Sequence, residues 1–220
     1  MFTGIVQAVG TLTALESRGG DARLHVNAGG LDLSDVGIGD SIATNGVCLT
    51  VADLPGQGFV ADVSGETLAL TTLGNMRPGS PLNLEKALTL STPLGGHLVS
   101  GHVDGVGRVL ERRKDARSIR YQVEAPGGLA RYIARKGSVC VDGISLTVNA
   151  VEGSVFELNL VPHTLMETAM SKSRPGDRVN LEVDLLARYL ERLMLGDRSG
   201  DSPREGVTLE LLARSGFLRR

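Results

Sequence analysis

Two short motifs in this 220-residue chain place a reactive side chain two residues before a threonine. The first motif holds Cys48 and Thr50, and the second holds Ser145 and Thr147. Residues two apart on a β-strand face the same side of the sheet, so each pair would point together. A thiol or hydroxyl beside another hydroxyl lines a polar pocket or supplies a weak nucleophile. The motifs therefore predict two related small-molecule sites.

Each of these side chains also has a structural interpretation. Cys48 and Cys140 would serve as small apolar core residues, and hydroxyls near glycines commonly cap turns. We interpret His25 and His97 as structural, and Lys136 as a solvated residue at the end of a helix. Spacing alone supports only two pockets lined by backbone and hydroxyl groups.

The two motifs belong to an internal duplication in which Gly4 falls on Gly101, an offset of 97 residues that holds without a gap as far as Glu85 and Glu182. A register this long indicates a true repeat. The copies differ at a few polar positions, where separate roles would arise. These differences are Ile5 to His102, Gly39 to Lys136, Cys48 to Ser145 and Gly65-Glu66 to Pro162-His163.

Short runs of alternating apolar residues predict that each copy consists mainly of strands. Five or six strands at a spacing of roughly 10–20 residues favour a small closed β-barrel. The predicted strands are 5–12, 24–26, 49–52, 59–63 and 82–84, then 103–109, 121–123, 146–150, 155–160 and 179–183. Short helices are predicted over 67–73 and 129–133. The predicted divisions are a first barrel (1–90), a linker (91–97) and a second barrel (98–184).

An amphipathic helix is predicted over residues 185–196, and the first copy has no counterpart of it. Its apolar residues recur at helical spacing. This stripe would pack either on its own barrel or on other subunits, and we assign the helix to oligomerisation. The tail, 197–220, is predicted to be a flexible link with a short helix over 207–218.

Composition excludes several classes of function. A net charge of −2 gives no basic field for nucleic acid. No segment approaches the roughly 18 apolar residues of a membrane span, and no signal peptide is evident, so we expect a cytoplasmic protein. Two cysteines make no disulfide framework. The sequence contains no metal-ligand set, catalytic triad or phosphate loop, so no metal or cofactor is expected.

Five motifs closely resemble riboflavin synthases: MFTGIV (1–6), NGVCLTV (45–51), ETL (66–68), GGHLVSGH (95–102) and DGISLTV (142–148). The resemblance implies a mainly β protein with two tandem six-stranded Greek-key barrels and a C-terminal α-helix that holds a homotrimer. It implies that each barrel binds one 6,7-dimethyl-8-ribityllumazine. It also implies transfer of a four-carbon unit between two lumazines, giving riboflavin and 5-amino-6-ribitylaminouracil. Lumazine synthase is an implied partner protein.

The resemblance also assigns catalytic roles. His102 would shuttle protons, since an ordinary histidine pKa of about 6.5 suits both directions. Ser145, Thr147 and Cys48 would hold or activate the attacking group, and Phe2 would pack over the stacked rings. The implied substrate-binding residues are Gly4, Ile5, Val6, Cys48, Leu49, Thr50, Asp62, Val63, Ser64, Gly65, Glu66, Thr67, Gly101, His102, Val103, Lys136, Ser145, Leu146, Thr147, Asn159, Leu160, Val161, Pro162, His163 and Thr164.

Two features depart from the family pattern. Val47 stands where the family has a cysteine, and the tail after Gly196 is extra. The alternative from another class is a non-catalytic lumazine- or flavin-binding antenna protein on the same fold. Such a protein needs one working pocket, whereas both copies keep their motifs here, including His102 and Ser145.

Overall fold

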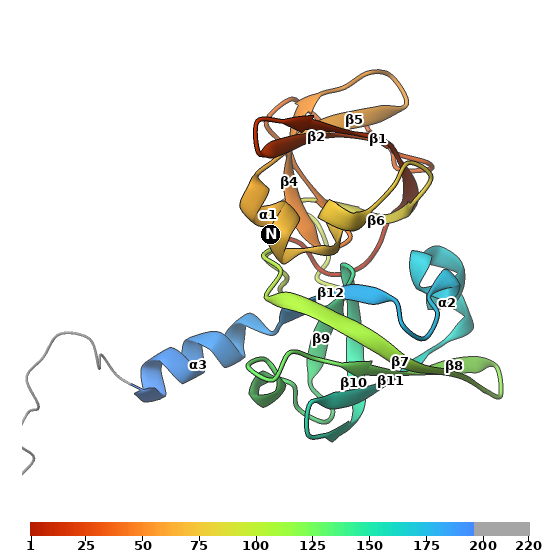
Figure 1. Cartoon of the computed structure of the whole chain (residues 1–220), viewed down its shortest axis with the longest axis vertical. Coiled ribbons are helices and arrows are strands. Elements are labelled where there is room, and N and C mark those ends of the chain that lie inside the picture. Colours follow the sequence, from red (N-terminus) through yellow and green to blue (C-terminus); the bar gives the residue numbers. More distant parts are fainter. Residues whose placement is uncertain (196–220) are drawn as a thin grey trace, which may run out of the picture. The chain divides into compact units, whose positions relative to one another are not determined.

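The computed structural model of the chain describes residues 1–195 and contains two closed antiparallel β-barrels (Figure 1). The order of strands is β1-β2-β5-β4-β3-β6 in the first barrel and β10-β11-β8-β7-β12-β9 in the second. In each barrel three strands follow one another as hairpins and the last strand returns beside the first of these, which is a Greek key. The predicted pair of six-stranded barrels is therefore confirmed.

The elements follow the same order in both copies. The first copy contains β1 (Ala8–Arg18), β2 (Asp21–Asn27), β3 (Ser41–Thr44), β4 (Val47–Asp53), β5 (Gly58–Val63), α1 (Gly65–Leu70), the 3₁₀ turn η1 (Thr72–Asn75) and β6 (Pro81–Lys86). The second contains β7 (Gly105–Asp115), β8 (Ser118–Glu124), η2 (Ala130–Tyr132), β9 (Ser138–Val141), β10 (Ile144–Glu152), β11 (Val155–Leu160), α2 (Pro162–Glu167), η3 (Ala169–Lys172) and β12 (Arg178–Val183), and α3 (Leu185–Leu195) follows.

The structure differs from the sequence prediction in several places, and strands β3 and β9, helix α2 and turn η3 were not predicted. Strands β1 and β7 begin at Ala8 and Gly105, later than predicted, because the residues before them leave their own barrel. The helix predicted over 129–133 is a single 3₁₀ turn, η2, since so short a segment forms too few helical hydrogen bonds to stabilise a helix. The helix predicted over 67–73 is divided into α1 and η1.

Each barrel encloses its own hydrophobic core, and the alternation along β4 shows how the strands divide their side chains. Val47, Leu49 and Val51 point into the first core, while Cys48 and Thr50 are more exposed and lie on the outer face. Strand β10 repeats this division: Ile144, Leu146 and Val148 contact the second core. Both predicted pairs therefore lie outside the barrels.

Reciprocal hydrogen bonds join the two barrels. The amide nitrogen of Asn83 donates to the carbonyl of Asp142 at 2.8 Å, and its oxygen accepts from the N–H of Ala169 at 2.7 Å. Asn180, the counterpart of Asn83, makes the equivalent bonds with the Asn45 carbonyl (2.9 Å) and the Thr72 N–H (2.8 Å). The barrels thus meet through a pseudo-twofold arrangement that satisfies buried amide groups on both sides.

Two glycines allow the barrels to approach closely at this contact. Gly46 and Gly143 both have positive φ, at 78° and 80°. A Cβ on either residue would lie 2.8 Å from the backbone nitrogen of the other. Only glycine meets both the conformational and the spatial requirement here.

We expect Asp142→Asn to stabilise the protein above neutral pH. Burial raises the pKa of Asp142 from 3.8 to about 7. Because the folded protein binds this proton more tightly than the unfolded chain does, the free energy of unfolding is highest below the unfolded pKa, about 4. It falls as the pH rises through about 7. Asparagine removes this titration and keeps an acceptor for the Asn180 N–H, which Asp142 binds at 2.7 Å, as Asn45 does for Asn83 in the first copy.

Denaturation of both proteins at acidic and alkaline pH measures this effect. The wild type should lose up to about 4 kcal/mol relative to the variant across this range, and less where the open cleft beside Asp142 admits water. The exposed Glu167 provides a control, and Glu167→Gln should follow the wild type. Parallel curves for wild type and Asp142→Asn would contradict the prediction.

Candidate functional site

A crossing segment precedes each barrel: residues 2–6 form the first and residues 99–103 the second. In the first, Thr3 and Gly4 donate backbone N–H groups to the buried carboxylate of Glu85 at 2.7 and 2.9 Å, and the Thr3 hydroxyl adds a third bond. In the second, Ser100 and Gly101 bind Glu182 in the same way. Burial raises the pKa of both carboxyls, which these hydrogen bonds oppose. Each segment is thus fastened to its own barrel.

The other side of each segment contacts the opposite barrel. The Gly4 carbonyl accepts from the N–H of Ser145 at 2.7 Å, and the Gly101 carbonyl accepts from the N–H of Cys48 at 2.8 Å. Val6 packs against the core of the second barrel, and Val103 against the core of the first. Each segment therefore stays fastened to its own barrel on one side and contacts the opposite barrel on the other, an arrangement that we call the exchange of segments.

This exchange decides which predicted residues share a site. His102 follows Gly101 and lies at the first site, with Cys48 and Thr50. The second site combines Ser145 and Thr147 with residues 4–6. His102 belongs to the same copy as Ser145 and Thr147, but within one chain the structure places it at the site of the other copy.

Glycine is required where each segment meets its strand. Gly4 and Gly101 have φ of +73° and +81°. A Cβ on Gly4 would lie 2.7 Å from the Cβ of Ser145, and one on Gly101 would lie 2.6 Å from that of Cys48. A side chain at either position would push the segment off the site.

Phe2 lies between the barrels, and Cys48 of the first site packs against the same small cluster. The side chain of Phe2 is fully buried in this cluster with Ala43, Val99 and Cys140, and its backbone pairs with that of Val99. The structure gives Phe2 a structural position at the pseudo-twofold contact, and a direct contact with substrate stays a prediction.

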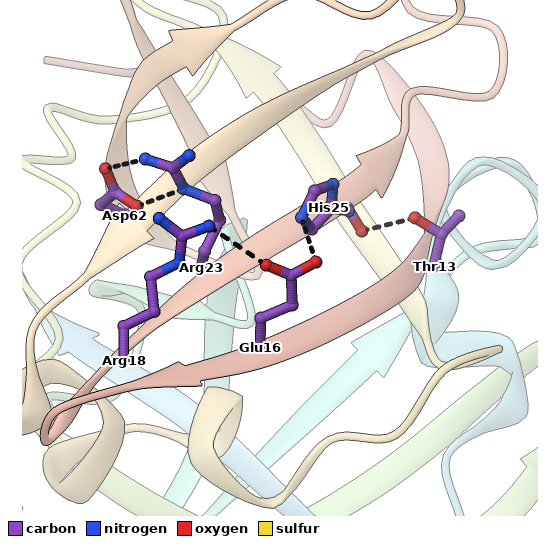
Figure 2. Close-up of polar contacts among 6 residues, drawn as sticks. All are labelled: Thr13, Glu16, Arg18, Arg23, His25 and Asp62. Atoms are coloured by element: carbon purple, nitrogen blue, oxygen red, sulfur yellow. Dashed lines mark hydrogen bonds and ion pairs between the residues drawn. The ribbon is translucent and has the colours of Figure 1, made fainter.

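Asp62 is held by an arginine (Figure 2). The guanidinium of Arg23 binds both carboxylate oxygens, at 2.7 and 2.8 Å, and holds the pKa of Asp62 below its usual range. Figure 2 also shows Glu16 between Arg18 and His25 on the same outer surface. A ligand that contacts Asp62 would therefore meet the Arg23–Asp62 ion pair rather than a free carboxylate.

The second copy is different at this position, because Asn159 replaces Asp62. The Asn159 Oδ1 atom is buried without a hydrogen-bond partner among the described residues. The neighbouring Arg120 binds Asp115 and Glu157 instead. The second site thus offers an unpaired acceptor where the first offers an ion pair.

The remaining predicted residues divide into backbone, capping and turn positions. Leu49, Leu146, Leu160 and Val63 are core residues, which leaves only their backbone for a ligand. Ser64 caps α1 by accepting from the Thr67 N–H at 3.1 Å. Six further residues lie at the starts of α1 and α2: Gly65, Glu66, Val161, Pro162, His163 and Thr164. Ile5 lies in the first crossing segment.

Lys136 lies in a turn, with φ of +67°, and its N–H donates to the Val148 carbonyl at 2.8 Å. It is therefore not the helix-end residue of our structural interpretation. The turn leads into β9 and lies beside the same strand, β10, that carries Ser145.

The sequence analysis assigned His97 a structural role, and the structure places its side chain beside Ser145 at the second site. The Nδ1 atom of His97 lies 2.7 Å from the hydroxyl oxygen of Ser145. Burial lowers the pKa of this imidazole.

Each closed barrel carries one outer-face site that is completed by the crossing segment of the other copy. This arrangement is that of a duplicated ligand-binding barrel protein. Both copies match the lumazine binding domain, over residues 3–87 and 100–184. The chain is 50% identical over 218 residues to a riboflavin synthase of Photobacterium phosphoreum, covering 99% of this chain and all of the relative. It is 36% identical to the enzyme of that name from Bacillus subtilis, with the same coverage. The chain belongs to the riboflavin synthase family.

A solved structure supports the fold. The structure of LumP complexed with riboflavin has a TM-score of 0.77 at 22% identity and covers 83% of this chain and 99% of its own. The relatives differ in how far they match the tail after Gly196. The match to the Photobacterium phosphoreum relative spans 99% of this chain, whereas a riboflavin synthase of Mycobacterium tuberculosis, 48% identical, covers 88% of this chain and 98% of its own length.

The predicted link and helix within residues 197–220 lie outside the described residues. Among residues 1–195, no helix is long and apolar enough to cross a membrane.

Proposed function

We propose that the chain converts two molecules of 6,7-dimethyl-8-ribityllumazine into riboflavin and 5-amino-6-ribitylaminouracil. One lumazine donates a four-carbon unit and the other accepts it, so the two products together contain every atom of the two substrates. The observation that carries this proposal is the duplicated site in a chain of this family, since one barrel site per reactant is what a reaction between two identical molecules requires.

The residues at the two sites fit complementary tasks. The reaction requires a base for the acidic C7 methyl group and a positioned group at C7 of the partner lumazine. His102 supplies an imidazole at the first site, and Ser145 supplies a hydroxyl at the second. Much of the barrier is overcome by holding the two rings face to face.

We further propose that the reacting pair forms between the first barrel of one subunit and the second barrel of its neighbour, in a homotrimer. Both sites are open on the outer faces: Thr50 and Thr147 are exposed, and so are the apolar side chains of Ile5 and Val161. A neighbouring subunit would cover these apolar groups. A location in the cytoplasm and an association with lumazine synthase stay predictions.

Purified protein incubated with lumazine alone should form riboflavin, followed by its absorbance. The expected rate is unchanged by a chelator and by added nucleotide, because the proposed groups all belong to the protein. A loss of activity on chelation that zinc or magnesium restores would contradict this. Tight, fluorescent binding of lumazine without turnover would instead identify an antenna protein.

A further inference from the structure

A cleft of about 520 Å³ lies between the two barrels, where Asn45 of one copy and Asp142 of the other both line it. All but one of its lining residues form pairs that the repeat offset of 97 relates, so both copies build it. None of the described residues that line it is among those predicted to bind lumazine. Ligand pockets in proteins measure roughly 300–1,000 Å³. The cleft is therefore large enough for a small molecule and shares no lining residue with the two outer-face sites.

The two copies give the cleft different charges. The first copy lines it with uncharged side chains, whereas the second has ionisable side chains at corresponding positions: Asn75, Ser80 and Pro81 correspond to Lys172, Asp177 and Arg178. By contrast, the residues that bond the barrels together, Asn83 and Asn180, are identical in the two copies. The charges are therefore not needed to join the barrels, and they make one side of the cleft suitable for a charged ligand.

Two side chains of the second copy bring positive charge to the cleft. Lys172 and Arg178 are exposed, and neither forms an ion pair with any residue in the range 1–195. Lysine and arginine are the side chains that most often bind phosphate groups in proteins. Their presence without a carboxylate partner favours an anionic ligand.

The position of Arg178 is unfavourable without an anion. Arg178 lies directly opposite Arg108 on β7, and like charges directly opposite in an antiparallel pair destabilise it. The corresponding residues of the first copy, Thr11 and Pro81, are uncharged. Glu124 lies opposite Arg108 on β8, yet within the described range it forms no ion pair with either arginine. An anion beside Arg178 would offset the repulsion.

Two carboxyls also line the cleft, and each already binds a backbone group. Asp177 accepts the N–H of Arg174, and Asp142 accepts the N–H of Asn180, both at 2.7 Å. Burial, together with the nearby charge of Asp177, raises the pKa of Asp142 to about 7, so this carboxyl is only partly ionised at neutral pH. The two cations therefore exceed the negative charge of the cleft.

The uncharged side of the cleft holds an unsatisfied hydroxyl. Thr72 is 6% exposed, and its Oγ1 atom is buried without a hydrogen-bond partner among the described residues. Buried polar groups nearly always have a partner, so this hydroxyl indicates a ligand group that would supply one. Asn75 adds an exposed amide to the same lining. A hydroxyl and an amide both donate and accept, which suits the hydroxyl groups of a sugar or sugar alcohol.

We propose that the cleft is a further ligand site, and that it binds a phosphate monoester that carries sugar or sugar-alcohol hydroxyls. Lys172 and Arg178 bind the phosphate, and Thr72 and Asn75 bind the hydroxyl groups. Such a ligand contacts both barrels, so its binding also stabilises the folded protein. The site is independent of the proposed function, because no residue assigned to lumazine belongs to it.

Calorimetric titration of the full-length protein with ribose 5-phosphate, inorganic phosphate and ribose tests the proposal. Ribose 5-phosphate should bind at least about 10-fold more tightly than ribose, as for one charge-assisted hydrogen bond. It should bind at least about 2-fold more tightly than inorganic phosphate, as for one neutral hydrogen bond. No saturable binding of ribose 5-phosphate, or an affinity no greater than that for ribose, would overturn the proposal. An equal affinity for inorganic phosphate would identify an adventitious anion site and would also overturn it.

Substitutions assign the binding to the cleft. Lys172→Asn, which introduces the residue of the first copy, and Arg178→Gln should each weaken binding of ribose 5-phosphate about 10- to 100-fold. Thr72→Val keeps the shape of the side chain and should weaken it about 2- to 13-fold, with no change for inorganic phosphate. Arg174→Gln is the matched control and should bind normally, because Arg174 is an exposed arginine of the same copy that does not line the cleft.

Thr147→Val tests whether the phosphate binds elsewhere. Thr147 lies at the second outer-face site, so this variant should bind ribose 5-phosphate normally. Weakened binding in Thr147→Val together with normal binding in Arg178→Gln would place the ligand at the outer-face site and overturn the proposal. All of these measurements are made without lumazine, so a protein that formed no riboflavin would leave the proposal standing.

Discussion

Replacement of His102 by glutamine should lower kcat about 10²- to 10⁴-fold and change the affinity for lumazine less than about 3-fold. The reason lies in how the second crossing segment is held. Ser100 and Gly101 bind Glu182 and the Gly101 carbonyl binds Cys48, all through groups other than the His102 side chain. Glutamine therefore leaves the segment in place and removes only the imidazole, which is exposed at the first site.

Single-turnover rates and equilibrium binding of lumazine, measured on the same preparations, separate the two effects. His25→Gln is the matched control, because His25 lies on the outer surface beside Glu16 and touches neither crossing segment. A variant that keeps a near-normal kcat at every pH would show that His102 has no catalytic role.

The duplication explains why so much of the fold could be predicted from one sequence. Two copies in register give every apolar position twice, so the five longer strands of each barrel were predicted. Strands β3 and β9 were missed because four residues such as Ser41–Thr44 are too short to show a period. The alignment of the two copies still indicated these strands, since Ser41 and Ile42 fall on Ser138 and Val139.

The arrangement of the sites was harder to predict, for a physical reason. A repeat assigns each residue to its own copy, and nothing in its pattern tells which barrel a segment contacts. The repeat shows only that His102 and Ser145 belong to the same copy, whereas the structure brings the segment of His102 to Cys48. Glu85 and Glu182 gave one indication. A charged residue at the same point of a buried strand in both copies needs buried hydrogen-bond partners.

Removal of α3 by ending the chain after Asp184 should convert the proposed homotrimer into a folded monomer that binds lumazine but turns it over slowly. The side chains of Leu186, Tyr189, Leu190, Leu193 and Met194 follow helical spacing and are each more than half exposed in the single chain. Burying five such side chains against other subunits contributes about 7–15 kcal/mol before the entropy of association is subtracted. Both barrels are complete before Asp184, so folding should survive the change.

Light scattering and reaction rate along one dilution series test this prediction. If the reacting lumazines lie on different subunits, the truncated protein should gain specific activity as its concentration rises, because transient association restores the paired site. A chain ended after Leu195 keeps the helix and is the matched control, which should remain oligomeric and active at every dilution. Leu193→Glu should behave like the truncation, since a charge in the stripe opposes its burial. A truncated protein that stays trimeric would show that the barrels alone hold the subunits together, and a fully active monomer would place both lumazines on one chain.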